Sequence, residues 1–344
     1  MPVLIGPLLL LPLAAFAAEP LTIGVSAPLS GPFAIVGKQI ADGAEAARTA
    51  LGQEKVKLVV SDDRCDGDGG KEAAAAFTAA KVSAVVGYLC SQALQGALPL
   101  LREQKIPVVA LGVRPEKILE DARKNGDAVF RLGPGSDDEQ TALSELLLPL
   151  WRGKNFAIID DGTIHARELA ESLRAAAEAR GLKPVFTDTF RPALENQMAL
   201  VNRLKKSGAT HVFAGGDRSD IAIIARDAAA QGVALTLAGG ETLEAAPDDV
   251  PLADGVIMAG APLPKADKGT GGPGAEGYFA SAYAAVEIIA QAASAGDGAA
   301  IAQNIGANAH PTLIGNVKFR PNGAQSGNPY RLLVSKSGRF EDFQ

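Results

Sequence analysis

The chain has 344 residues, which is more than an ordinary single domain holds and suits two domains of about 150 residues each. Apolar residues make up 47% of the chain and charged residues 21%, so a normal globular core can be buried. Aromatic residues are only 5%, and this mixture favours helices packed on a sheet over a β-sandwich. The formal net charge of -6 indicates neither nucleic acid nor an anionic membrane surface as a partner.

The N-terminal residues 1–18 contain no charged side chain and hold the apolar run Leu8–Leu11. The segment Ala15–Ala17 fits the small-x-small pattern at which secretory signals are cleaved. No Lys or Arg precedes the apolar run, which departs from that pattern, and a buried N-terminal strand is the alternative interpretation. We expect residues 1–17 to be a signal peptide that is removed on export to the periplasm. No other segment resembles a membrane span.

The first part of the mature chain alternates short apolar runs with helical patterns. We expect strands at 21–25, 56–60, 82–87 and 106–110, and helices at 35–51, 70–81 and 93–105. These strands are continuous apolar runs rather than alternating ones, so both of their faces should be buried. This is typical of a parallel sheet that is covered by helices.

The same rhythm restarts after Arg131–Gly135, a glycine- and proline-rich stretch that suits a segment crossing between domains. The second series comprises strands at 156–159, 184–190, 211–214, 234–237 and 255–259, and helices at 139–151, 166–180, 197–206 and 221–230. Two successive β-α-β series predict two doubly wound α/β domains. The tail adds expected helices at 278–293 and 299–305 and strands at 316–319 and 331–334, which would suit a chain that returns to the first domain.

The two cysteines, Cys65 and Cys90, both belong to the first series. An even number of cysteines permits a disulfide in an exported protein, whereas a cytoplasmic protein would keep two reduced thiols. Two cysteines without a nearby histidine make a poor zinc site, so we expect no metal there.

Enzyme signatures are largely missing. The chain contains no P-loop, no His-Glu-x-x-His and no Gly-x-Ser-x-Gly, and its three histidines are scattered. A hydrolase would need a nucleophile and a base at the strand ends, and Ser91 with His165 is the only candidate pair, with one residue in each series. We therefore expect no catalytic residues and no enzyme activity.

Two further segments match ligand-binding motifs only in part. Gly272–Gly277 fits G-x-G-x-x-G before a helix, but no strand runs into it and Pro273 removes an amide that a phosphate would need, so we expect no cofactor. Asp62–Asp68 is acidic, but an EF-hand needs an oxygen ligand where Arg64 stands and a glutamate where Ala73 stands. We expect this segment to be a solvated loop without a metal ion.

The informative positions are the carboxyl ends of the expected strands, because ligands of open α/β sheets bind there. Polar or small residues follow five strands, at Ser26–Gly31, Leu89–Ser91, Gly112–Arg114, Gly215–Asp217 and Gly239–Glu241. Ser91 stands at the expected N-cap of a helix, where a hydroxyl and free amides would hold a carboxylate. Glu241 would pair with an ammonium group, so the two together would read a zwitterion. The alternatives are ordinary helix capping for Ser91 and a solvated loop charge for Glu241.

Several of these segments resemble the leucine/isoleucine/valine-binding proteins, the periplasmic receptors of branched-chain amino-acid ABC importers. The resemblance is carried by Ala27–Phe33, Ser61–Asp66, Val85–Ser91, Arg203–Lys206, Gly215-Gly216 and Gly240-Glu241, and covers nearly all of the mature chain. It implies the type I periplasmic-binding fold, with two α/β lobes that are joined by three crossings and close on the ligand. It also implies an N-terminal lobe of residues 18–132 and 261–325 and a C-terminal lobe of residues 133–260 and 326–344.

The resemblance further implies a disulfide between Cys65 and Cys90. It implies that the segment Leu89-Cys90-Ser91 binds the ligand carboxylate and that Glu241 binds the ligand ammonium.

Three positions depart from the family pattern and all concern the ligand. Gly112-Val113-Arg114 stands where the family has a threonine, Asp217 stands where it has a tyrosine, and His165 replaces another tyrosine. Arg114 would replace the missing hydroxyl with a bidentate contact, and Asp217 beside Glu241 favours a second cationic group on the ligand. We therefore expect an amino compound other than plain leucine, such as a basic or polar amino acid.

Taken as a whole, the sequence predicts the substrate-binding component of an amino-acid ABC importer. Its expected partners are a small amino-acid-like ligand and the ABC permease and ATPase subunits, without nucleic acid, and we expect a monomer. The alternative is a ligand-sensing receptor or regulator of the same fold without a transport role.

Overall fold

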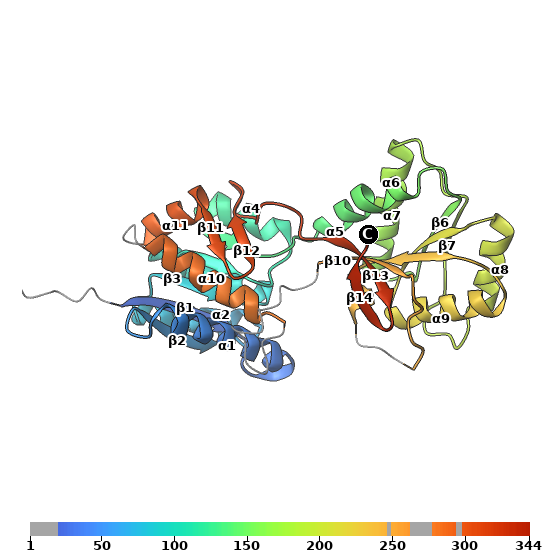
Figure 1. Ribbon diagram of the computed structural model, residues 1–344. Coiled ribbons are helices and arrows are strands. Elements are labelled where there is room, and N and C mark those ends of the chain that lie inside the picture. Colours follow the sequence, from blue (N-terminus) through green and yellow to red (C-terminus); the bar gives the residue numbers. More distant parts are fainter. Residues whose placement is uncertain (1–19, 246–248, 262–276, 294–297) are drawn as a thin grey trace, which may run out of the picture.

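The computed structural model describes residues 20–245, 249–261, 277–293 and 298–344. These residues form two α/β lobes that lie side by side and are joined by extended stretches of chain (Figure 1). The expected signal peptide and most of the motif Gly272–Gly277 lie outside the described residues. Within the described ranges, no helix is both long and apolar enough to cross a membrane.

The first lobe is built on a five-stranded parallel sheet with the order β2-β1-β3-β4-β5. Its strands are β1 (Leu21–Ala27), β2 (Val56–Asp62), β3 (Ala84–Gly87), β4 (Val108–Ala110) and β5 (Val129–Arg131). The register pairs Ser26 of β1 with Ser61 of β2 on one side and Gly87 of β3 on the other. The carboxyl ends of these strands therefore meet at one edge of the sheet, where the expected ligand-binding loops begin.

Helices cover both faces of this sheet, as the continuous apolar runs predict. The helices are α1 (Ala34–Leu51), preceded by the short η1 (Gly31–Phe33), α2 (Gly67–Ala79), α3 (Ser91–Glu103), α4 (Glu116–Asn125), α10 (Phe279–Ala292) and α11 (Gly298–Ala307). One core lies between the sheet and α1, α10 and α11, and the other lies between the sheet and α2, α3 and α4. The hairpin of β11 (Ala309–Thr312) and β12 (Gly315–Lys318) contributes Val317 to the first core.

The second lobe is built on a seven-stranded sheet with the order β14-β13-β10-β9-β8-β6-β7. Its strands are β6 (Phe156–Asp160), β7 (Phe186–Thr189), β8 (His211–Gly215), β9 (Thr236–Gly239), β10 (Ile257–Gly260), β13 (Arg331–Lys336) and β14 (Arg339–Asp342). Strands β6 to β10 are parallel, and β13 and β14 extend the sheet in antiparallel fashion.

The helices of the second lobe also lie on both faces of their sheet. They are α5 (Asp138–Ala142), the π-helical η2 (Leu143–Leu147), α6 (Leu148–Leu150), α7 (Ile164–Ala179), α8 (Met198–Ser207), α9 (Arg218–Ala230) and η3 (Glu241–Glu244). Trp151, which follows α6, packs with η2 and α7 on one face. Helices α8 and α9 and the turn η3 form the core on the opposite face.

The chain passes between the lobes three times. It leaves the first sheet after β5, returns after β10 to form α10, and leaves again after β12 to form β13. The two stretches of the first lobe that lead into the first and third crossings are bonded to each other, because Arg131 N–H donates to Gly323 O at 2.8 Å and Gln325 N–H donates to Arg131 O at 3.0 Å. The prediction of two doubly wound lobes joined by three crossings is confirmed. We propose the lobe limits at 132/133, 260/261 and 325/326.

Besides the short turns η1 and η3, four elements were not expected from the sequence, namely α4, β5, β11 and β14. Helix α4 does carry ordinary signals, because it follows Pro115 and ends at Gly126, whose φ of 79° lies in the left-handed region. The three-residue strand β5 has no such signal, since it is too short to show a period.

Candidate functional site

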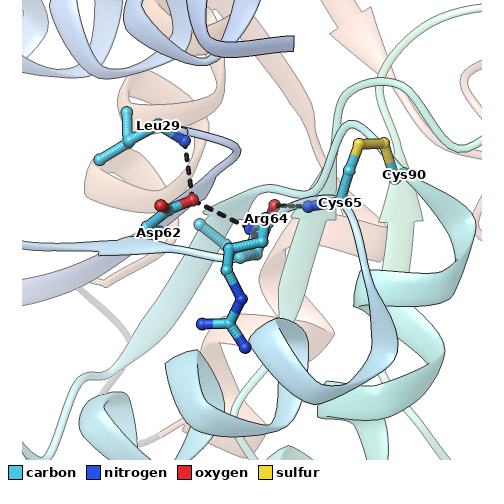
Figure 2. Close-up of a disulfide and its surroundings, with 7 residues drawn as sticks. Leu29, Asp62, Arg64, Cys65 and Cys90 are labelled. Carbon is cyan, nitrogen blue, oxygen red and sulfur yellow. Dashed lines mark hydrogen bonds between the residues drawn. A yellow bond between two sulfur atoms is a disulfide. The ribbon is translucent and has the colours of Figure 1, made fainter. Parts of the chain in front are cut away.

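The disulfide between Cys65 and Cys90 ties together two loops at the carboxyl edge of the first sheet. Their Cα atoms are 5.2 Å apart, and the bond joins the loop after β2 to the residue that precedes α3 (Figure 2). The pairing that the family resemblance implies is therefore present. It holds the start of α3, and with it Ser91, against the neighbouring loop.

Two aspartates, Asp62 and Asp63, fix the loop after β2 through hydrogen bonds. Asp62 Oδ1 accepts hydrogen bonds from the N–H groups of Leu29 at 2.8 Å and Arg64 at 2.9 Å (Figure 2). Asp63 is fully buried and accepts from the Ser26 hydroxyl at 2.8 Å and the Cys65 N–H at 3.0 Å. Burial raises the pKa of Asp63, although both hydrogen bonds oppose it. The expectation of a solvated loop is therefore wrong for these residues, which anchor the loop to β1.

The expected carboxylate-binding segment lies at this edge. Helix α3 begins at Ser91 and has Cys90 as its N-cap, one residue earlier than the sequence predicts. Leu89 and Ser91 are half-buried. Gly112 lies directly beneath this segment, because a Cβ atom there would come within 2.6 Å of Leu89 O. Val113, by contrast, is 1% exposed and packs in the core with α3 and α4.

A cavity of about 500 Å³ lies where the two lobes and their crossings meet. Its lining includes residues of both lobes and of all three crossings. Both its volume and its position between the lobes are typical of a small-molecule site. The walls combine apolar side chains such as Leu111, Leu132 and Ile314 with the polar groups of Arg114, Glu241 and Tyr278. The cavity therefore suits a small molecule with an apolar part and charged ends.

Arg114 and Glu241 meet across the lobes in this cavity. Arg114 Nη1 donates to Glu241 Oε1 at 2.5 Å, and the Tyr330 hydroxyl donates to Glu241 Oε2 at 2.6 Å. Arg114 Nη1 also donates to the Tyr330 oxygen at 3.2 Å. Arg114 follows β4 of the first lobe, Glu241 follows β9 of the second, and Tyr330 ends the third crossing.

Each of these three groups is held in one protonation state. Burial acts to raise the pKa of Glu241, but the hydrogen bonds from Arg114 and Tyr330 outweigh it, so that pKa lies below its usual value. Burial acts to lower the pKa of Arg114, and Glu241 reverses this effect, so that pKa is raised. Burial and the bond to Glu241 raise the pKa of Tyr330. At neutral pH the pair is therefore charged and the phenol is protonated.

Glu139 lies inside the second lobe and binds the backbone of Glu241. Glu139 is 2% exposed, and its Oε1 accepts a hydrogen bond from the Glu241 N–H at 2.7 Å. Its Oε2 lies 3.4 Å from His165 Nε2, at the start of α7. A side chain on Gly240 would meet Glu139 Oε1 at 2.3 Å, so glycine at this position lets the carboxyl reach the backbone. Burial raises the pKa of Glu139 to about 7, and the Glu241 charge adds to this rise.

Glu139 should make the stability of the protein depend on pH. Its folded pKa of about 7 lies above the reference value of 4.5, so the folded state holds a proton between these values that the unfolded state has lost. Stability from this group is complete below pH 4.5 and is lost as pH rises through about 7. The loss amounts to roughly 3 kcal/mol over this window. We expect Glu139→Gln, which cannot ionise, to show a flatter dependence of unfolding free energy on pH.

The measurement is chemical denaturation of both proteins at about pH 5 and about pH 8. The matched control is Glu145→Gln, because Glu145 is an exposed glutamate of the neighbouring η2. It should retain the slope of the unsubstituted protein. Equal slopes for Glu139→Gln and the unsubstituted protein would contradict the role of Glu139.

The remaining expected residues lie in the second lobe but outside the cavity lining. Asp217 is the exposed N-cap residue of α9, and His165 is half-exposed beside Glu139. Of the residues expected from the sequence, Arg114 and Glu241 are those that line the cavity. Tyr330, Tyr278 and Glu139 were missed, because their place depends on the crossings and on packing between lobes. In the part of the chain that the structure describes, no group of three His, Cys, Asp or Glu side chains is placed to hold a metal ion.

Comparison with known families matches almost the whole chain. A family model described as periplasmic binding protein matches residues 20–339. The Leu/Ile/Val-binding protein homolog 3 of Brucella melitensis is 27% identical, with 95% of this chain and 94% of that protein covered. The Leu/Ile/Val-binding protein BraC3 of Rhizobium johnstonii is 28% identical, with 95% of each chain covered.

Solved structures share the fold at lower identity. A putative branched-chain amino acid ABC transporter structure from Rhodospirillum rubrum has a TM-score of 0.76 at 20% identity and covers 94% of this chain and 100% of its own. An ABC transporter substrate-binding protein from Desulfitobacterium hafniense, in complex with Leu, has a TM-score of 0.68 at 22% identity, with 94% and 99% covered. A solute-binding protein from R. palustris, in complex with 4-hydroxybenzoate, has a TM-score of 0.66 at 16% identity, with 95% and 96% covered.

Proposed function

Because this chain belongs to the periplasmic binding protein family, we propose that it delivers a small amino acid or related amino compound to an ABC importer from the periplasm. The resemblance to the leucine/isoleucine/valine-binding proteins that the sequence motifs indicate is confirmed by the family match and the curated relatives. The relatives and the structural neighbours are binding proteins rather than enzymes. Permease and ATPase subunits are the partners that this role requires, and we propose that the protein works as a monomer.

The observation that carries the proposed ligand is the pair of opposite charges in one cavity. Arg114 of the first lobe and Glu241 of the second lie among apolar walls, so the cavity offers a cation for a carboxylate and an anion for an ammonium group. The neighbours from Desulfitobacterium hafniense and R. palustris were solved with Leu and 4-hydroxybenzoate, and both ligands carry a carboxylate. Leu also carries an ammonium group, for which Glu241 is the anion that lines the cavity.

We propose that the segment Leu89-Cys90-Ser91 joins the site when the lobes close. Ser91 lies at the first-lobe edge that also carries Arg114, and the first N–H groups of α3 are free to bind an anion. His165 and Asp217 would approach from the second lobe. Closure that buries the ligand between the lobes gains contacts that the open form lacks, so ligand binding favours the closed form.

The experiment is a thermal-shift and calorimetric screen of residues 20–344 against the standard amino acids, their decarboxylated amines, benzoate and 4-hydroxybenzoate. We expect at least one amino acid to bind, and a ligand at about 100 times its Kd to stabilise the protein by roughly 2.7 kcal/mol. The variant Ser91→Ala should weaken that binding about tenfold, which is the worth of one hydrogen bond. Binding of benzoate but of no amino acid or amine would contradict the proposed cargo.

A further inference from the structure

Arg114 and Glu241, the charged groups that would bind the ligand, are hydrogen-bonded to each other. Glu241 uses both carboxylate oxygens, one toward Arg114 Nη1 at 2.5 Å and the other toward the Tyr330 hydroxyl at 2.6 Å. Arg114 makes its side-chain bonds to described residues through Nη1, and its side chain remains 40% exposed at the cavity. A ligand carboxylate can therefore approach the rest of the guanidinium group, while the Glu241 carboxylate is fully engaged.

We propose that this interlobe ion pair is exchanged for a zwitterionic ligand, so that the site accepts molecules with both charges and rejects those with only one. The ligand carboxylate takes the place of Glu241 on Arg114, and the ligand ammonium takes the place of Arg114 on Glu241. The inference rests on the proposed function, because it concerns the same cavity and names its class of ligand.

The selectivity follows from what each incomplete ligand would leave behind. A simple carboxylate that displaced Glu241 from Arg114 would leave Glu241 without its cation in a half-buried site, and a simple amine that displaced Arg114 from Glu241 would leave Arg114 without its anion. An uncompensated buried charge is strongly unfavourable, whereas a zwitterion compensates both. Glu139 adds to the free-energy cost of a Glu241 that has lost its cation, because the Glu139 carboxyl lies against the Glu241 backbone.

Tyr330 gives the exchange a fixed geometry. Its hydroxyl donates to Glu241 Oε2, the oxygen that Arg114 does not use, so this bond can persist while the ion pair opens. The N–H of Tyr330 donates to Asn328 Oδ1 at 2.9 Å, and Asn328 Nδ2 donates to Asp138 O at 2.8 Å, at the start of α5. Tyr330 is thus tied to the second lobe and is a positioning residue for the Glu241 carboxylate.

The exchange also connects ligand chemistry to lobe movement. Arg114 belongs to the first lobe, whereas Glu241 belongs to the second, so their direct contact holds the lobes together in the absence of a ligand. A zwitterion replaces this one direct contact with two, from Arg114 to the ligand carboxylate and from Glu241 to the ligand ammonium. The two lobes then contact each other through the ligand.

The main test uses ligands that differ by one charge and needs no variant. Calorimetry would compare leucine with 4-methylpentanoate and 3-methylbutylamine, and phenylalanine and lysine with their deaminated and decarboxylated analogues. We expect any amino acid that binds to lose about 100-fold in affinity when either charge is removed. If a deaminated acid or benzoate binds as tightly as the amino acids, the exchange is refuted while the solute-binding role stands. If no carboxylate and no amine binds, both proposals are refuted.

Variants of the pair test the exchange from the protein side. Glu241→Gln should lose about 100-fold for the amino acid and gain about tenfold for its deaminated acid, because Arg114 is released. Arg114→Gln should shift preference toward the amine. Glu145→Gln, which removes an exposed charge of the second lobe, should change neither affinity. A double-mutant cycle of Arg114→Gln and Glu241→Gln measures how much the ion pair contributes to the stability of the protein without ligand. We expect a coupling of at least about fivefold in the unfolding constant, and additive effects would refute the pair.

Discussion

Substituting Gly70 by alanine is expected to lower the unfolding free energy by about 3 kcal/mol, because the new methyl group collides with backbone rather than with a movable side chain. A Cβ atom at Gly70 of α2 would lie 1.9 Å from Ala93 O of α3. A second close approach lies nearby, since a Cβ at Gly96 would be 2.1 Å from Gly67 O. Helices α2 and α3 therefore pack at a distance that only glycine allows, and the substitution must push them apart.

The same helix offers a matched control for this prediction. A Cβ atom at Gly67 would meet only Gln92 O at 3.8 Å, which is ordinary contact. Gly67→Ala should therefore stay within about 1 kcal/mol of the unsubstituted protein. Chemical denaturation measures both variants. Because α3 carries Ser91 at its start, the Gly70→Ala protein that does fold should also bind its ligand more weakly, and equal stability of the two variants would contradict the packing argument.

Removing the disulfide by Cys65→Ser/Cys90→Ser is expected to cost about 3 kcal/mol, chiefly because the unfolded chain gains freedom. The two cysteines are 25 positions apart, so the bond closes a loop that contains all of α2 and β3. The loss would show as a lower denaturation midpoint. It should also loosen the start of α3, where the disulfide holds Ser91 beside the loop after β2.

Reduction supplies the control for the disulfide. Dithiothreitol should lower the midpoint of the unsubstituted protein by the same amount and leave the double serine variant unchanged. If dithiothreitol changes neither protein, the bond does not contribute to stability.

Much of the fold could be predicted because local patterns and topology agree. Continuous apolar strands such as Ala84–Gly87 indicate burial on both faces, and this strand lies inside the first parallel sheet. The expectation is wrong for β2, which is an edge strand with Val60 46% exposed. The strands that the sequence did not predict were missed for local reasons. Strand β5 has only three residues, and β14 is a terminal hairpin partner with the half-exposed pattern of an edge strand. The acidic loop was misjudged because sequence does not show that Asp63 reaches Ser26 across 37 positions.

The site could be predicted only where it follows strand ends. Arg114 and Glu241 lie in the loops after the parallel strands β4 and β9, and the rule that ligands bind at such strand ends includes both among its candidates. Tyr330 could not be found this way, because it lies 216 positions from Arg114 and 89 from Glu241 and reaches them through the third crossing. Val113 shows the opposite case, since it sits in the expected segment but points into the core.

The return of the chain to the first lobe has a consequence for how the protein can be built. The core beneath α1 is completed by α10, α11 and β12, which are synthesised after all five parallel strands of the second lobe. The second sheet in turn receives β13 and β14 only at the end of the chain. Neither lobe is a continuous piece of sequence, so each lobe is complete only when the C-terminal part of the chain has been synthesised. A ribosome-bound chain would therefore expose the apolar face of the first sheet until α10, α11 and β12, which lie in the last quarter of the chain, had emerged.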